Sequence, residues 1–319
     1  MRRVLVTGGA GFVGRHAVAA LTDHGFEVHA VGRTAPPGVQ AFHAADLLDE
    51  GQRRAAVRAA GASHLLHLAW VTIPGRYWQA PDNLDWTAAS LDLVRTFREA
   101  GGNRAVVAGT CAEYDWTDLP GVQSGRLPEA APCRPATLYG SAKDGLRRIL
   151  HAYAMTAGLS LAWGRLFYLY GPGETPGRLV GDTARALISG QRLATSEGRQ
   201  RRDFLHVDDA GAAFAALLDS GVEGPVNIGS GEAVPVRTIL ETVGALTGRP
   251  DLIDFGARPL GASEPACIEA DILNFSFSRM VWSPPTKQFS RMNSPASSGL
   301  LWAMSDMARA TTTRPGSFR

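Results

Sequence analysis

The sequence has 319 residues, of which 45% are hydrophobic and 19% charged, and its formal net charge is +2 at pH 7. This balance is typical of a globular protein and gives no support for binding to nucleic acid or to a membrane surface. Its three cysteines, Cys111, Cys133 and Cys267, are widely spaced without a CxxC pair. That spacing argues against a disulfide framework or a metal site and for a cytoplasmic protein. No segment reaches about 18 uninterrupted apolar residues, so we expect no membrane span.

The chain begins with a strand, a glycine turn and a helix. Val4–Val6 is a short apolar run typical of a buried strand, and it is followed by TGGAGFVG and an apolar helical pattern. In this context the glycine spacing is typical of a dinucleotide-binding turn. Gly8 permits the tight turn, Gly11 lets the backbone approach a pyrophosphate, and Gly14 lets the helix pack on the strand. The alternative is a glycine-rich turn without a ligand.

The second strand ends at a residue that bears on the choice of cofactor. Glu27–Gly32 indicates a strand, and Arg33 follows it. Sites for NAD usually carry an acidic residue here, which binds the ribose 2′-hydroxyl, whereas an arginine suits a 2′-phosphate. Arg33 therefore favours NADP(H) slightly over NAD(H), although an ordinary surface arginine gives the same pattern. Asp46, after an expected third strand, could reach the adenine or cap a helix.

Further strands and helices alternate along the chain. Apolar runs at Ser63–Ala69, Arg104–Ala108 and Leu159–Phe167 indicate strands, and helical spacing covers Asn83–Ala100 and 137–157. This alternation predicts a parallel sheet with helices on both faces. Ligands bind at the carboxyl edge of such sheets, so the residues after each strand are the candidates for a site.

The second half of the chain is richer in turns. Helical spacing covers Leu179–Leu193 and Ala210–Leu218, and Asn227–Gly231 indicates a strand followed by a turn. After about residue 274 the sequence is rich in Ser, Met, Pro and Arg and lacks periodicity, so we expect partial disorder there.

These patterns predict an α/β protein built on a Rossmann-type doubly wound parallel sheet. Residues 1–165 are expected to form the dinucleotide-binding domain, joined by returning segments near 200–230. Residues 166–273 are expected to form mainly a smaller C-terminal substrate-binding lobe, and 274–319 an atypical tail.

Tyr139 and Lys143 are four residues apart at the start of a predicted helix, so they share one face. An ammonium close to a phenol lowers the pKa of the phenol. Tyr139 could then exchange a proton with a substrate oxygen near neutral pH. Alone, the spacing would suit two surface neighbours equally well, but the glycine turn at the start of the chain favours a catalytic pair.

Six motifs in this order resemble the extended short-chain dehydrogenase/reductase family of nucleotide-sugar epimerases, dehydratases and ketoreductases. They are TGGAGFVG, His67-Leu-Ala, Tyr139-Gly-Ser-Ala-Lys143, Arg165-Leu-Phe…Tyr170-Gly-Pro, Arg202-Asp-Phe…His206-Val-Asp-Asp and Asn227-Ile-Gly-Ser-Gly. The resemblance covers about residues 3 to 273. It implies a nicotinamide cofactor, a nucleotide-sugar substrate and a homodimer that pairs through helices of the first domain.

The resemblance also implies roles for individual residues. Tyr139 is similar to the catalytic acid/base, Lys143 to the residue that tunes it and holds the nicotinamide ribose, and Thr110 to the second hydroxyl, four residues before Tyr114. A second donor is needed because the reacting oxygen gains negative charge. Asn83 is similar to a residue near the cofactor, although it could equally be a helix N-cap. The residues implied for the cofactor are Gly8, Gly11, Phe12, Val13, Gly14, Arg33, Asp46, Leu47, Leu68, Ala69, Asn83, Tyr139 and Lys143.

On the substrate side, Arg202 and Arg258 resemble contacts to the nucleotide diphosphate, which an arginine fork suits. Cys111 and Ala112 stand where the family's 4,6-dehydratases carry Asp-Glu, so we do not expect that reaction. Tyr168 replaces the family's Asn before the Tyr-Gly-Pro element, so the nucleotide base cannot be read. The implied substrate contacts are Cys111, Tyr168, Arg202 and Arg258.

Four tryptophans follow segments that should face the cleft, where they could stack on a sugar or base or pack in the core. They are Trp70, Trp78, Trp86 and Trp116.

Three functions follow from the resemblance. The first is a 4-ketoreductase that uses NADPH on a nucleotide-linked 4-keto-6-deoxyhexose, which Arg33 favours. The second is a nucleotide-sugar 4-epimerase with tightly bound NAD. The third is an inactive cofactor-binding regulator, against which the intact set of Thr110, Tyr139 and Lys143 argues.

Overall fold

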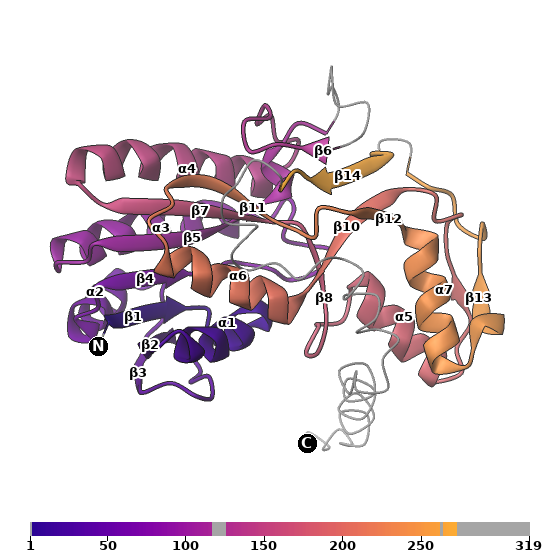
Figure 1. The fold of residues 1–319 in the computed structure, drawn as a ribbon, viewed down its shortest axis with the longest axis horizontal. Helices are drawn as coiled ribbons and strands as arrows, with labels where there is room; N and C mark the ends of the chain where they lie inside the picture. Colours follow the sequence, from indigo (N-terminus) through magenta and orange to yellow (C-terminus); the bar gives the residue numbers. More distant parts are fainter. Residues whose placement is uncertain (1, 117–125, 262–263, 273–319) are drawn as a thin grey trace.

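The computed structural model describes residues 2–116, 126–261 and 264–272 (Figure 1). The expected tail 274–319 lies outside these ranges. The helices are α1 Phe12–Asp23, α2 Glu50–Ala60, α3 Asp82–Glu99, α4 Leu138–Ala157, α5 Leu179–Ile188, α6 Val207–Asp219 and α7 Val236–Thr247, with short 3₁₀ turns η1 Cys111–Glu113 and η2 Pro250–Leu252. The strands are β1 Arg2–Thr7, β2 Phe26–Gly32, β3 Ala41–Ala44, β4 His64–His67, β5 Arg104–Thr110, β6 Arg126–Leu127, β7 Ser160–Leu166, β8 Tyr168–Tyr170, β9 Leu193–Ala194, β10 Arg201–His206, β11 Gly224–Ile228, β12 Ala233–Pro235, β13 Ile253–Asp254 and β14 Cys267–Ala270.

Seven parallel strands form the central sheet in the order β11-β7-β5-β4-β1-β2-β3. The first strand lies inside it, because Val4 pairs with Val28 of β2 on one side and with His64 of β4 on the other. The chain therefore winds outward from β1 in both directions, and the loops after these strands meet at one edge. The prediction of a Rossmann-type doubly wound parallel sheet is confirmed.

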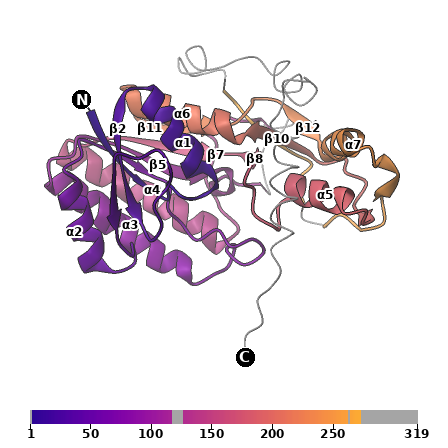
Figure 2. The same cartoon turned by 90° about the horizontal axis from the view of Figure 1, so that it is seen from below.

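Alternate residues of the strands pack against helices on opposite faces of the sheet. Leu5 belongs to a core that includes apolar side chains of α2, α3 and α4, whereas Val4 and Val6 belong to a core with α1 and α6. Figure 2 shows these two helical layers on either side of the strands. Burying one Leu or Val side chain stabilises the fold by roughly 1.5–3 kcal/mol. This two-sided burial explains why the strands are continuous apolar runs in the sequence.

Local sequence signals define the ends of the helices that carry the site. The Thr137 hydroxyl accepts a hydrogen bond from the N–H of Gly140 at 3.1 Å and caps α4. Gly158 then ends α4 in a left-handed conformation with φ of 62°, which costs glycine little. In contrast, Gly11 precedes α1 without any side-chain cap, so the N–H groups of its first turn are left for another acceptor.

A second, smaller set of strands forms the lobe at the right of Figure 1, together with α5 and α7. Its strand order is β12-β10-β14-β6, and β8 pairs with β10. The buried carboxylate of Asp203 on β10 joins this sheet to the turn after β11. It accepts hydrogen bonds from the backbone N–H groups of Ser230, Gly231 and Ala270 and from the Ser230 hydroxyl.

Two helices differ from the sequence expectation at their ends. Helix α5 stops at Ile188 rather than near Leu193, because Gly190 adopts φ of 74° and β9 follows. Helix α6 begins at Val207, before the expected Ala210, since the His206 side chain accepts from the N–H of Asp208.

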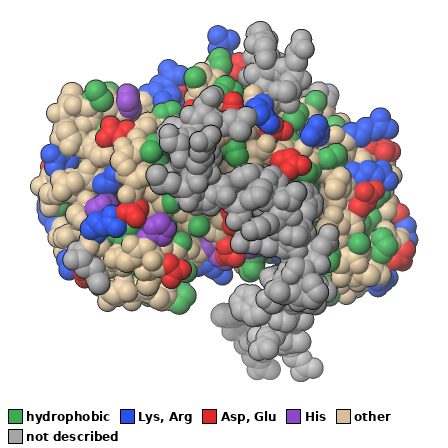
Figure 3. Space-filling view, in the orientation of Figure 1, with side chains coloured by type: hydrophobic (Ala, Val, Ile, Leu, Met, Phe, Trp, Pro, Cys, Tyr) green, Lys and Arg blue, Asp and Glu red, His purple; other side chains and the backbone are tan. Residues whose placement is uncertain are grey.

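Within the described ranges, no helix combines the length and apolar character that crossing a membrane requires. On the face seen in Figure 3, acidic and basic side chains are interspersed over both lobes, in keeping with the small net charge.

Candidate functional site

The glycine turn between β1 and α1 has the backbone geometry of a phosphate-binding site. Gly8 has φ of 72°, and a Cβ there would lie 2.7 Å from the backbone nitrogen of Ala69. A Cβ on Gly14 would overlap the carbonyl oxygen of Gly8. The N–H of Gly11 donates to that same oxygen at 2.9 Å and closes the turn. Only glycine fits these positions, and the uncapped α1 N-terminus leaves donors for a pyrophosphate. The turn therefore fits a dinucleotide, with Phe12 and Val13 in the first turn of the helix.

A buried hydrogen-bond network connects this turn to the end of β4. The Thr7 hydroxyl oxygen accepts from the N–H groups of Leu68 and Ala69, so its own proton donates to Nδ1 of His67 at 2.6 Å. The Nε2–H of His67 then donates to the Ser90 hydroxyl at 2.8 Å. Burial lowers the pKa of His67 to about 3, so the ring is neutral and keeps this tautomer. The network fixes Leu68 and Ala69 beside the glycine turn, where the sequence predicted cofactor contacts.

The residues expected at the adenine end lie after β2 and β3. Arg33 is exposed, and in the described part of the chain its guanidinium forms no ion pair. Asp46 is not the helix N-cap: it accepts from the N–H of Leu48 at 3.0 Å, and Asp49 caps α2. The neighbouring Leu47 is buried, and its carbonyl accepts from Arg53 at 2.7 Å.

The predicted catalytic residues come from β5 and α4. Thr110 is the last residue of β5, Tyr139 and Lys143 lie on the first turns of α4, and the Thr110 hydroxyl is close enough to Tyr139 to act to lower the pKa of its phenol. The ammonium of Lys143 is buried. It donates to the Ala108 carbonyl at 2.9 Å and lies 3.7 Å from the ring centre of Trp70. The structure thus brings the two hydroxyls together and holds the ammonium beside the same strand.

The electrostatics of this group differ from the sequence expectation. Burial raises the pKa of Tyr139 above its ordinary value, and the nearby Thr110 hydroxyl only partly opposes this rise. The expected net lowering by Lys143 is therefore wrong for this structure, in which the ammonium faces Ala108 and Trp70 instead. Burial lowers the pKa of Lys143 to about 7, while the negative charge of Glu113 acts in the opposite direction.

An aromatic wall packs against the Tyr139 phenol. The rings of Tyr77 and Trp78 stack on each other at 4.6 Å and meet the Tyr139 ring edge-on at 4.9 and 5.8 Å. The N–H of Tyr139 donates to the Trp78 carbonyl at 3.0 Å. Arg178, which precedes α5, lies 5.4 Å from the Tyr77 ring centre, and its positive charge acts to lower the pKa of the Tyr77 hydroxyl. This contact connects the smaller lobe to the aromatic wall that meets Tyr139 of α4.

The four tryptophans divide between these two surroundings. Trp70 and Trp78 contact Lys143 and Tyr139 respectively. Trp86 packs on Trp70 at 6.3 Å, and Trp116 donates to the Cys111 carbonyl. The first pair belongs to the site and the second to the packing behind it.

Asn83 organises the loop that carries the aromatic wall. Its amide donates to the carbonyls of Tyr77 and Ala80, and its side-chain oxygen accepts from the Trp70 indole at 2.9 Å. The N-cap of α3 is Pro81, so the alternative role of Asn83 as a helix cap is wrong. Its predicted place near the cofactor stays a prediction.

The predicted substrate residues lie in the smaller lobe and at the start of η1. Arg202 is buried, pairs with Glu264 and lies 5.7 Å from the ring centre of Tyr168. Its guanidinium therefore already has an anionic partner, which a diphosphate would have to replace. Arg258 is exposed on the loop beside β9. Cys111 is buried, which raises the pKa of its thiol to about 12. A contact of these four residues with substrate stays a prediction.

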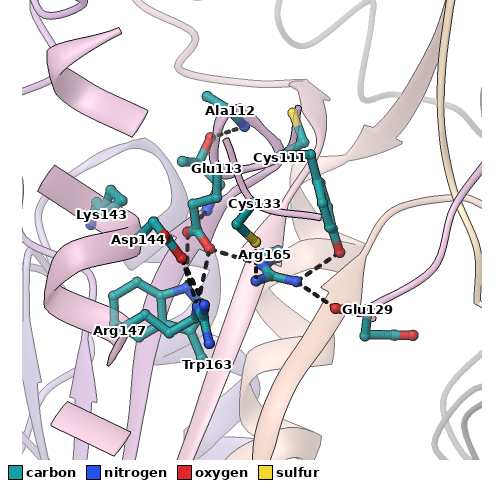
Figure 4. Close-up of polar contacts among 12 residues, drawn as sticks. Cys111, Ala112, Glu113, Glu129, Cys133, Lys143, Asp144, Arg147, Trp163 and Arg165 are labelled. Carbon is teal, nitrogen blue, oxygen red and sulfur yellow. Dashed lines mark hydrogen bonds and ion pairs between the residues drawn. The ribbon is translucent and has the colours of Figure 1, made fainter. Parts of the chain in front are cut away.

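Sequence reasoning missed one buried carboxylate at the centre of this site. Glu113 accepts a hydrogen bond from the backbone N–H of Thr110 at 2.8 Å (Figure 4). The Thr-x-x-Glu spacing of a capping box was the available signal.

In the described residues no group of His, Cys, Asp and Glu side chains has the arrangement of a metal site.

Comparisons with known proteins identify the family of this chain. A family model described as "NAD dependent epimerase/dehydratase family" matches residues 4–229. The UDP-glucose 4-epimerase of Corynebacterium glutamicum is 27% identical, with 84% of this chain and 87% of that protein covered. The dTDP-4-dehydro-6-deoxy-D-allose reductase of Streptomyces bikiniensis is 28% identical, with 82% and 86% covered.

Among solved structures, MoeE5 in complex with UDP-glucose and NAD is 30% identical with a TM-score of 0.74, and the match covers 88% of this chain and 92% of that one. The family match extends from β1, through the glycine turn and the helix of Tyr139 and Lys143, to the turn after β11. The chain therefore belongs to the NAD dependent epimerase/dehydratase family.

Proposed function

We propose that this protein is an NADPH-dependent 4-ketoreductase of a nucleotide-linked 4-keto-6-deoxyhexose. The observation that supports it is the approach of two hydroxyls, those of Thr110 and Tyr139, at the carboxyl edge of the sheet whose first strand leads into the glycine turn. Two donors meeting at one point suit a carbonyl oxygen that gains negative charge. The next two positions, Cys111 and Ala112, offer no carboxyl group for the acid and base that a 4,6-dehydration needs.

Each residue then has one task. When bound, the nicotinamide supplies the hydride. Tyr139 donates its proton to the sugar C4 oxygen, and burial keeps that proton on the phenol at neutral pH in the free protein. Thr110 donates a hydrogen bond to the same oxygen. Lys143 holds the nicotinamide ribose and supplies positive charge nearby, while Tyr77 and Trp78 exclude water from one side of the phenol.

Arg33 is the basis for the cofactor preference. Its exposed guanidinium at the end of β2 suits a 2′-phosphate. Loss of a charge-assisted hydrogen bond costs roughly 1.5–3 kcal/mol, so Arg33→Ala is expected to weaken NADPH binding by about tenfold or more and to leave NADH binding unchanged. Calorimetric titration with both dinucleotides measures this, with the exposed Arg58→Ala as the control. Equal effects on both dinucleotides would count against NADP(H) preference.

A 4-epimerase with tightly bound NAD is the second candidate. It is supported by the similarity to a UDP-glucose 4-epimerase and to a structure solved with UDP-glucose and NAD. The same two hydroxyls would serve it, because oxidation and reduction at C4 need one group that takes and returns a proton.

Assays with both substrate classes separate the candidates. The reductase predicts stoichiometric NADPH consumption with a dTDP-linked 4-keto-6-deoxyhexose, a substrate class taken from the name of one relative. The epimerase predicts interconversion of UDP-glucose and its C4 epimer without net change of the nicotinamide, and NAD that copurifies with the protein. Failure of both assays in a protein that binds a dinucleotide would favour the inactive regulator.

The quaternary part of this proposal is a homodimer formed through α3 and α4. Exposed apolar side chains on their outer surface support it: Leu84 on α3, and Ile149 and Met155 on α4. Because α4 also carries Tyr139 and Lys143, such a dimer would brace the catalytic helix.

A further inference from the structure

The side chain of Glu113 is fully buried, and its two oxygens have separate partners (Figure 4). Oε1 accepts from the backbone N–H of Thr110 at 2.8 Å and from the Trp163 indole at 2.9 Å. Oε2 accepts from Nε of Arg165 at 2.8 Å. The hydroxyl of Thr110 in turn accepts from the N–H of Ala112 at 3.2 Å. The carboxylate therefore fixes the backbone of the residue that carries the second hydroxyl.

The surrounding chain is shaped to admit this carboxylate. A Cβ on Gly109 would lie 2.6 Å from Oε1 of Glu113 and would overlap the indole nitrogen of Trp163. Only glycine at this position lets both groups reach the end of β5. Arg165 is held as well, because it donates to the Tyr114 hydroxyl and to the Glu129 carbonyl, both at 2.9 Å. An arrangement this specific restricts Glu113 to one orientation.

The charges that face Glu113 come from two elements. Arg165 on β7 is its close partner. On α4, Arg147 lies 3.9 Å away but is itself engaged by Asp144. Lys143, also on α4, lies 6.0 Å from the ring centre of Trp163, whose nitrogen donates to Glu113. The Trp163 indole therefore binds the carboxylate and also lies near the ammonium.

Few other groups influence Lys143. His67 is neutral, the Ala108 carbonyl accepts its hydrogen bond, and Trp70 covers it. Against the burial that favours loss of its proton, Glu113 is the anion that acts to keep the pKa of Lys143 higher.

We propose that Glu113 is a positioning residue for the reaction: its carboxylate fixes the Thr110 backbone and places a buried negative charge near the Lys143 ammonium. The consequence for catalysis rests on the proposed function, but both physical effects are properties of the free protein. They can be separated. The geometric effect needs a side-chain oxygen at hydrogen-bond distance from the Thr110 N–H, whereas the electrostatic effect needs a negative charge on residue 113.

Two substitutions make this separation. Glu113→Gln keeps an acceptor at the same reach for the N–H of Thr110 but removes the charge. Glu113→Asp keeps the charge but is one methylene too short to hold Thr110. The matched control is Asp144→Asn, which removes another buried carboxylate next to Lys143 that binds Arg147 and Arg148 instead.

The small number of lysines allows the protonation of Lys143 to be measured directly by NMR. Lys143 and Lys287 are the only lysines in the sequence, so ¹³C-lysine labelling gives two side-chain signals, and Lys287→Arg assigns them. We expect the Lys143 signal of the dinucleotide-free protein to titrate near pH 7. It should shift to lower pH in Glu113→Gln and stay in place in Asp144→Asn and Glu113→Asp. An unchanged titration in Glu113→Gln, or an equal shift in the control, would refute the electrostatic role.

Kinetics test the geometric role. Glu113→Asp is expected to lower kcat at least tenfold with an unchanged pH profile, whereas Glu113→Gln should move the profile to lower pH along with the Lys143 signal. If Glu113→Gln does not fold because Arg165 is left unpaired, the double variant with Arg165→Met removes both charges and receives the same titration. Wild-type kcat in Glu113→Asp would overturn the geometric role. Since the NMR titration needs no substrate, a wrong reaction assignment leaves it intact and is recognised separately by the absence of wild-type turnover.

Discussion

The phenol of Tyr139 is the group on which the proposed chemistry depends. Tyr139→Phe removes only the oxygen that holds the transferable proton, and general acid catalysis contributes about 10²–10⁴-fold. We expect kcat to fall by about that factor while dinucleotide affinity, measured by calorimetry, stays the same. Tyr153→Phe is the matched control, because this half-buried ring lies on the same helix and packs against the hydrophobic core. Unchanged turnover in Tyr139→Phe would contradict the assigned role.

Glu174, in the loop before α5, makes stability depend on pH. Burial raises the pKa of its carboxyl from 4.5 to about 7, so the folded state retains a proton that the unfolded state loses. The contribution of Glu174 to stability is therefore largest below pH 4.5 and is lost as pH rises to 7, by about 2–3 kcal/mol. In urea unfolding, Glu174→Gln should lack this decline, whereas Glu232→Gln, at an exposed position, should retain it. A parallel pH dependence of wild type and Glu174→Gln would contradict this.

At the residue scale, sequence reasoning identified partners better than it identified charge states. Spacing alone was enough to place Tyr139 and Lys143 on one helix face. It could not show that burial raises the pKa of the phenol, or that the ammonium faces Trp70, because both depend on side chains from other elements. Glu113 was missed for the same reason: its partners Trp163 and Arg165 lie some 50 residues further along the chain.

At the scale of elements, two glycine substitutions separate the effect of close packing in the turn from the effect of helix propensity. Gly14→Ala places a methyl group against the carbonyl of Gly8, so it should destabilise the protein by about 1–3 kcal/mol and weaken dinucleotide binding severalfold or more. Gly145→Ala is the control, since a Cβ there meets open space within α4. It should stabilise by about 0.5–1 kcal/mol. Thermal unfolding and calorimetric binding measure both, and wild-type binding by Gly14→Ala would contradict the role of the turn.

Element types followed from periodicity, whereas element ends depended on individual turns. The strands of the central sheet are buried on both faces and so appear as continuous apolar runs. The pattern after Leu179 continued past the true end of α5 because apolar spacing persists into β9, and only the conformation of Gly190 separates them. Likewise, Asp46 and Asp49 are both plausible caps in the sequence, and the structure shows that Asp49 caps α2.

At the scale of the whole molecule, topology was predictable for the first sheet and not for the second. Alternation of strands and helices is enough to imply parallel, right-handed connections. The smaller lobe instead joins short strands that are distant in sequence: Arg126 of β6 pairs with Glu269 of β14, which pairs in turn with β10. Strands of two to four residues carry too little periodicity to be recognised. The pairing of Arg202 with Glu264 was hidden because Glu264 lies outside any strand, 62 residues further along the chain.

The last prediction concerns assembly. Ile149 and Met155 on α4 are 53% and 74% exposed, and a surface of this kind is stabilised when a second copy covers it. Replacing both with Glu would bring four carboxylates into the proposed two-fold interface, so we expect a dimer-to-monomer change in light scattering and a less stable catalytic helix. Ile188→Glu, at an exposed apolar residue of α5, should leave the mass unchanged. If the wild type is already monomeric at working concentration, or the α4 double variant remains a dimer, then α4 does not form the interface and its exposed apolar side chains need another explanation.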